Sequence, residues 1–267
     1  MLAYLQLLLL GAIAGFTIFL GLPLAALQHV SANVKGFLNA VAMGILVFLI
    51  VDVFAHALAS VEGATLGAYT GTAPLGDAML ALVALFGGLA VGLLGLVFYE
   101  TRYLASPRAG ERSPQVDAYR LATMIAIGIG AHNFSEGVAI GQSYASGSVG
   151  LAVLLIIGFG AHNSTEGFGI AGPLTGLAKR PSARFLITAG LIGGGPTLLG
   201  TILGSVWSSA FTYVLFLSLA GGALVYVTLM MYNVGRRQAV NTILMVGIFV
   251  GLVAGFASDL LVTLGGA

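Results

Sequence analysis

Long apolar blocks, separated by short connections rich in Gly, Pro and charged residues, form the main pattern along this chain of 267 residues. The blocks lack the strict alternation of a half-buried strand, and each is about as long as the roughly 20 residues that cross a bilayer core as a helix. The blocks are 2–27, 37–60, 78–100, 118–143, 149–173, 183–204, 209–232 and 240–264. The pattern predicts an all-α, polytopic membrane protein with eight transmembrane helices in a single domain, residues 1–267.

Composition agrees with this prediction. Hydrophobic residues make up 58% of the chain and charged residues only 7%, whereas soluble domains carry about 25% charged residues. The 40 glycines suit membrane helices, because Gly lets helix backbones approach closely. The chain has no Cys, which excludes disulfides and thiolate metal sites. The first block has no positive leader region or cleavage site, so we expect it to be a retained span.

Basic residues orient the predicted spans. All of them lie in or beside the connections that follow odd-numbered blocks. They are Lys35, Arg102, Arg108, Arg112, Arg120, Lys179, Arg180, Arg184, Arg236 and Arg237. The opposite connections have no Lys or Arg, and basic residues in short loops mark the cytoplasmic side. We therefore expect both termini outside the cytoplasm, a cytoplasmic loop at 101–117, and a multi-pass protein of the plasma membrane.

Three pairs of ionisable residues lie in the middle of blocks, each pair four residues apart. They are Asp52 and His56, His132 and Glu136, and His162 and Glu166. Residues at this spacing share one face of a helix. Ionisable groups at bilayer depth are unfavourable and usually mark a site or a pathway. No Lys or Arg lies at the same depth, so protons, neighbouring side chains or a bound cation must balance their charge.

Two of these pairs belong to a repeated motif, GIGAHNFSEGVAIG at 128–141 and GFGAHNSTEGFGIA at 158–171. The short connection at 144–148 predicts that the two motif helices are antiparallel neighbours. Their His and Glu side chains would then meet near the bilayer midplane. Imidazole and carboxylate groups bind Zn²⁺ or a similar divalent ion, with Asn133 and Asn163 as weaker oxygen ligands. A second adjoining metal site that shares Glu166 is conceivable from the residues alone.

Two other polar positions have simpler explanations. Asp52 and His56 are either pathway residues or a polar pair bonded to a neighbouring helix. Asp259 lies toward the outer end of the last block, where an interfacial position is one explanation.

The sequences HNFSEG at 132–137 and HNSTEG at 162–167 resemble the fourth- and fifth-helix motifs of the ZIP family of divalent metal transporters. Eight spans with both termini outside also match that family, so the resemblance covers essentially the whole chain. It implies import of a divalent metal into the cytosol, with Zn²⁺ the commonest substrate and Fe²⁺, Mn²⁺, Co²⁺ and Cd²⁺ as others. The implied transport site consists of His132, Asn133, Glu136, His162, Asn163 and Glu166. Asp52 and His56 fall on the second helix, where family members place pathway residues.

The resemblance also implies a 3+2+3 arrangement of the eight helices, elevator-like alternating access and often a homodimer. The chain departs from the family at Ser135, where relatives usually have Pro; a Ser there can bend the helix by bonding back to a carbonyl. The sixth block reads GLIGGGPTLLG at 190–200 and lacks the acid that many relatives have there. We therefore expect a single metal site, and a break in this helix at the GGGP run that exposes carbonyls to a cavity.

Two alternatives belong to other functional classes. An intramembrane metal hydrolase would use the same His and Glu side chains to activate water, but HExxH is absent. A proton-coupled carrier of an organic solute would use Glu136 and Glu166 as proton sites, and would not need the repeated His. We expect a transporter rather than an enzyme, with the metal as substrate and no cofactor. Neither a nucleotide-binding motif nor a basic patch for nucleic acid is present.

Overall fold

The computed structural model describes residues 2–27, 31–104, 113–145, 149–207, 209–238 and 240–264, and these ranges contain helices and no β-strand. The elements are α1 (Leu2–Phe16), α2 (Ile18–Gly21), η1 (Leu22–Ala26), α3 (Ala32–Thr70), α4 (Leu75–Tyr99), η2 (Glu100–Leu104), α5 (Pro114–Ala145), α6 (Val149–Ala171), η3 (Gly172–Leu174), α7 (Ala183–Val206), α8 (Ala210–Gln238) and α9 (Asn241–Leu264). The prediction of an all-α fold is confirmed for the described residues.

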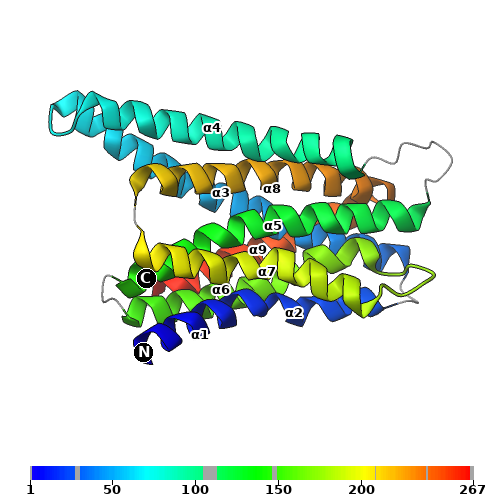
Figure 1. Cartoon of the computed structure of the whole chain (residues 1–267). Coiled ribbons are helices and arrows are strands. Elements are labelled where there is room, and N and C mark those ends of the chain that lie inside the picture. Colours follow the sequence, from blue (N-terminus) through cyan, green and yellow to red (C-terminus); the bar gives the residue numbers. More distant parts are fainter. Residues whose placement is uncertain are drawn as a thin grey trace.

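The long helices lie side by side in a bundle (Figure 1). Helix α1 begins, and α9 ends, at the same end of the bundle as the turn from α3 to α4, on the left of Figure 1. Six helices among the described residues are long and apolar enough to cross a membrane: 4–26, 32–70, 75–102, 183–206, 210–233 and 241–260. The chain is therefore a membrane protein with multiple apolar helices. The motif helices α5 and α6 are not among the six, so a total of eight spans stays a prediction.

Local signals explain where α3 begins and ends. The Ser31 hydroxyl accepts a hydrogen bond from the Val34 amide at 3.3 Å and caps its first turn. Gly71 ends the helix in a left-handed conformation with φ of 72°, and Pro74 then precedes α4. Helix α3 has 39 residues, about 58 Å at 1.5 Å per residue. It is thus much longer than the predicted block 37–60.

Two helices differ from the predictions. The expected break at the GGGP run is wrong, because α7 continues from Ala183 to Val206 with Pro196 inside it. Glycines of α7 pack directly against α1 and α5, and this packing holds the helix together where Pro removes one hydrogen bond. The first block, predicted as one helix, is interrupted at Thr17, whose hydroxyl donates to the Ala14 carbonyl at 2.6 Å. A hydroxyl bonded in this way can bend a helix.

Glycines bring the helices into backbone contact within two groups. The first, here called the motif group, contains α1, α2, α5, α6 and α7. In this group Gly137 of α5 lies against the Thr197 carbonyl of α7, and Gly200 of α7 lies against the Phe134 carbonyl of α5. A Cβ atom at either glycine would overlap those backbone atoms, so α5 and α7 interlock. Similar contacts join α1 to α7 and α2 to α6.

The second, here called the frame group, contains α3, α4, α8 and α9. Gly44 of α3 and Gly251 of α9 approach each other's backbones, and Gly92 of α4 lies against the Leu219 carbonyl of α8. Contacts between the two groups are different in kind. Gly169 of α6, for example, faces the side chain of Ala42 in α3 at an ordinary van der Waals distance. Backbones therefore interlock within each group, whereas the contacts between the groups at these glycines are mainly with side chains, some of them tight: a Cβ atom on Gly128 of α5 would lie 2.8 Å from the Val227 side chain of α8.

Candidate functional site

The α5 copy of the motif is buried. His132, Asn133 and Glu136 expose 3%, 0% and 5% of their surfaces. The Nε2 atom of His132 lies 3.1 Å from Oε1 of Glu136, as expected for residues one helical turn apart. Ser135 donates its hydroxyl to the His132 carbonyl at 2.6 Å. This is the back-bond expected where relatives have Pro, and it orients the turn that carries the His and Glu side chains.

A direct hydrogen bond links the α6 copy of the motif to the α5 copy. Asn133 donates through Nδ2 to Oε2 of Glu166 at 2.9 Å, and both side chains are buried. His162 belongs to α6, but its side chain lies outside the described residues. Among the described side chains, no three His, Asp or Glu are placed to hold one metal ion. The predicted set of two His and two Glu around one ion therefore stays a prediction.

The two amides of the motifs also bind neighbouring backbones. Asn133 Nδ2 donates to the Gly193 carbonyl of α7 at 3.0 Å, and Asn163 Nδ2 donates to the Ala14 carbonyl of α1 at 3.0 Å. Both Oδ1 atoms are buried without a hydrogen-bond partner among the described groups. Each is an oxygen acceptor that a cation or water can use. The Gly193 carbonyl is a site component that the sequence indicated only indirectly, through the GGGP run.

A cavity of about 220 Å³ adjoins the α5 motif. Its acidic and histidine lining residues are Asp52, His56, His132, Glu136 and Asp259. The Nδ1 atom of His56 lies 2.9 Å from the Asp52 carbonyl oxygen and 3.4 Å from the Asp52 carboxylate. The predicted pathway pair of α3 thus shares a cavity with His132 and Glu136. Asp259 of α9 lines the same cavity. Its position toward the outer end of the last block did not indicate this contact.

The electrostatics of this cavity favour cations. Three carboxyl groups and two imidazoles line it, and none of its described lining residues is Lys or Arg. Glu166 and Asn163 are not among the lining residues; they lie behind the α5 motif and are reached through the Asn133 hydrogen bond. The arrangement can attract a divalent cation from the cavity and present it to buried oxygen and nitrogen ligands.

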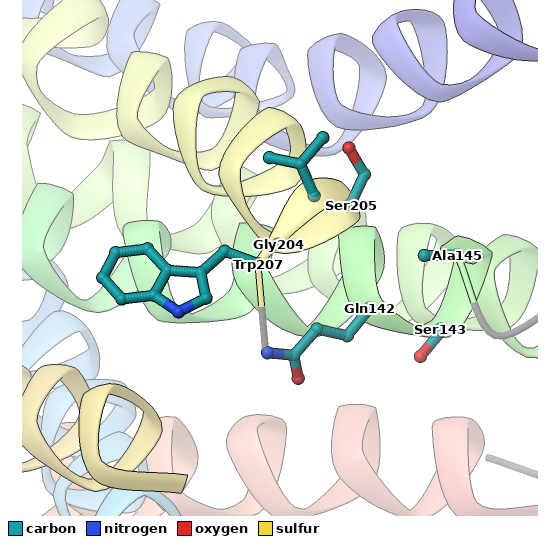
Figure 2. A pocket seen from close by; sticks show the side chains of 7 residues that line it. Gln142, Ser143, Ala145, Gly204, Ser205 and Trp207 are labelled. Atoms are coloured by element: carbon teal, nitrogen blue, oxygen red, sulfur yellow. The ribbon is translucent and has the colours of Figure 1, made fainter. Parts of the chain in front are cut away.

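Two further cavities continue from the acidic cavity toward the end of the bundle. One, of about 310 Å³, shares Ala139 and Tyr213 with the acidic cavity and adds Gln142, Ser143 and Ser209. The other, of about 580 Å³, shares Gln142 and Ser143 with the second and reaches Trp207 at the end of α7 (Figure 2). Neutral polar side chains from α5, α7 and α8 therefore line a route from the end of the bundle to the acidic cavity.

Comparison with known proteins gives one match. The family model described as ZIP Zinc transporter matches residues 106–259, which is more than half of the chain and includes both motifs. No curated protein matches the chain. The chain therefore belongs to the ZIP zinc transporter family, whose members transport divalent metal ions and are not enzymes.

Proposed function

We propose that this protein imports Zn²⁺ into the cytosol through a buried site between α5 and α6. The ligands come from His132, Asn133, Glu136, His162, Asn163 and Glu166. The observation that carries this proposal is the buried hydrogen bond from Asn133 to Glu166, which joins the two motifs beside an acidic cavity. Zn²⁺ is the preferred substrate because imidazole and carboxylate are its usual ligands. Fe²⁺, Mn²⁺, Co²⁺ and Cd²⁺ are the competing substrates.

The ion enters from the end of the bundle that holds the turn from α3 to α4. The three cavities connect that end to His132 and Glu136, and basic residues concentrate at the opposite end. Because basic loops mark the cytoplasm, the cavities open to the extracytoplasmic side. The neutral polar entrance passes a hydrated ion, and Asp52 and Asp259 attract it toward the site.

Release to the cytosol occurs when the motif group moves against the frame group. Backbone contacts at glycines support each group as a rigid unit, while side chains make the contacts between them at Gly169. The site residues belong to the motif group, so its movement carries the ion. We further propose a single transport domain in the plasma membrane, with both termini extracytoplasmic and two copies forming a homodimer.

Zinc uptake into proteoliposomes tests this function. Glu136→Gln and Glu166→Gln remove one ligand charge each and should abolish uptake, while the exposed Glu62→Gln outside the cavities is the matched control. A competition series with the other four metals then ranks substrates. If both site variants transport Zn²⁺ like the parent, the proposal is wrong. Absence of bound divalent metal in the purified protein would favour a proton-coupled solute carrier, and metal-dependent hydrolysis of lipid or peptide would favour an enzyme.

A further inference from the structure

Asn39 of α3 is a buried amide to which the described residues offer no hydrogen bond. It is 1% exposed, and neither its Nδ2 nor its Oδ1 has a hydrogen-bond partner among the described residues. Buried amides in proteins are almost always hydrogen-bonded, because an unpaired polar group is unfavourable in an apolar environment. An isolated amide of this kind in the interior of a membrane bundle therefore requires an explanation.

Asn39 lies where the two helix groups meet. A Cβ atom built on Gly172, in the η3 turn that follows α6, would lie 3.6 Å from Oδ1 of Asn39. A Cβ atom on Gly235 of α8 would lie 3.3 Å from its Nδ2. One turn further along α3, Ala42 faces Gly169 of α6. Asn39 and Ala42 thus form a small-residue surface of the frame group that packs on the end of α6 and η3.

At this surface the helices are packed less tightly than α5 and α7 are at Gly137. At Gly169 and Gly172 the space can hold an added methyl group without overlap, since the nearest atoms would be 3.6 Å from it. At Gly137, within the motif group, the same methyl group would overlap the backbone of α7. Side chains are not interlocked at the first two positions, so α6 and η3 can separate from α3 without first unpacking.

Asn39 is on the other side of the proposed metal site from the acidic cavity. Gly172 follows Glu166 by six residues, about 9 Å along a helix axis. Asp52, which lines the acidic cavity, is thirteen residues further along α3 than Asn39. Lys35 precedes Asn39 by one turn, and Arg236 follows Gly235 directly. These basic residues mark this end as cytoplasmic.

Resting on the proposed transport function, we infer that Asn39 is the polar residue of the closed inner gate and the first amide that the ion meets on leaving the site. When α6 and η3 move away from α3, water reaches Asn39, and its Oδ1 becomes available to the departing divalent cation. When the gate closes, the Asn39 amide loses its contacts with water and with the cation. Asn39 therefore makes the closed state less stable and the open state more stable, which speeds opening.

An apolar residue at this position should reverse the effect. In Asn39→Leu the closed gate gains apolar packing, and we expect Zn²⁺ uptake to slow by about fivefold or more. The free-energy cost of an unpaired buried amide changes the equilibrium constant between two states by about this factor. Zn²⁺ bound per purified protein should stay unchanged. Asn39→Ser, which keeps a polar group, should retain faster uptake than Asn39→Leu. Met43→Leu is the packing control, since Met43 lies against the same Gly235 and the exchange conserves volume.

Cysteine labelling tests the gate without relying on Asn39→Leu to fold. Because the chain has no Cys, Asn39→Cys introduces the only thiol. A membrane-impermeant thiol reagent should modify it from the cytoplasmic face alone. Uptake by Asn39→Leu at the parental rate, labelling from the outer face, or no labelling from either face would overturn the inference. If Glu136→Gln and Glu166→Gln abolish uptake while these outcomes occur, the gate is wrong and the transport function stands.

Discussion

The contact between α5 and α7 makes a quantitative prediction about Gly137→Ala. Gly137 lies against the Thr197 carbonyl, and Gly200 makes the reciprocal contact with the Phe134 carbonyl. A methyl group at Gly137 would overlap the α7 backbone at Thr197 and Thr201, so the two helices must move apart. Overpacking of this kind costs about 1–3 kcal/mol. The higher helix propensity of Ala offsets about 1 kcal/mol of that loss.

Gly87→Ala is the matched control. Gly87 is a mid-helix glycine of α4, and a Cβ atom there would have no neighbour within 4 Å. The propensity gain is the same at both positions, so the two variants should differ in stability by the overpacking term alone, about 1–3 kcal/mol. For a chain of this size, 1 kcal/mol corresponds to roughly 2–4 °C in Tm.

Thermal unfolding of the parent and both variants, purified in one detergent, measures this difference. Gly137→Ala should melt below Gly87→Ala by roughly 2–12 °C. Since Gly137 directly follows Glu136, Gly137→Ala should also weaken Zn²⁺ binding, and Gly87→Ala should not. Equal melting temperatures for the two variants, or a higher one for Gly137→Ala, would show that α5 and α7 are not in backbone contact.

Three other predictions concern the site and its support. Asn133→Ala removes a proposed ligand oxygen together with the hydrogen bonds to Glu166 and Gly193, and should lower Zn²⁺ affinity about 10- to 100-fold by titration calorimetry; unchanged affinity would show that Asn133 neither binds the ion nor positions its ligands. Acidification should release Zn²⁺, because protons compete with the metal for imidazole and carboxylate ligands; binding that is equal at pH 5 and pH 7 would contradict that ligand set. Glu100 and Arg120 form a partly buried ion pair between η2 and α5. Glu100→Gln should lower Tm, and the loss should shrink in an Arg120→Gln background; equal losses in both backgrounds would mean that the pair contributes no coupling.

The sequence by itself determined the properties that depend on near neighbours along the chain. Apolar blocks predicted the helices, because helix formation in a bilayer satisfies every backbone group within the segment. The spacing of His132 and Glu136 predicted their proximity, since residues four apart share a helix face whatever surrounds them. The repeated HNxxEG motif indicated the family, which the match over residues 106–259 confirmed.

Tertiary structure alone decided how the helix faces combine. Asn133 bonds both Glu166 and the Gly193 carbonyl, and Asp259 lines a cavity with Asp52, only because of how distant helices are rotated against each other. The continuity of α7 through Pro196 and the lack of a hydrogen-bond partner for Asn39 among the described residues have the same origin. Local sequence sets each helix and its faces, but close packing across the whole bundle sets their rotation and depth.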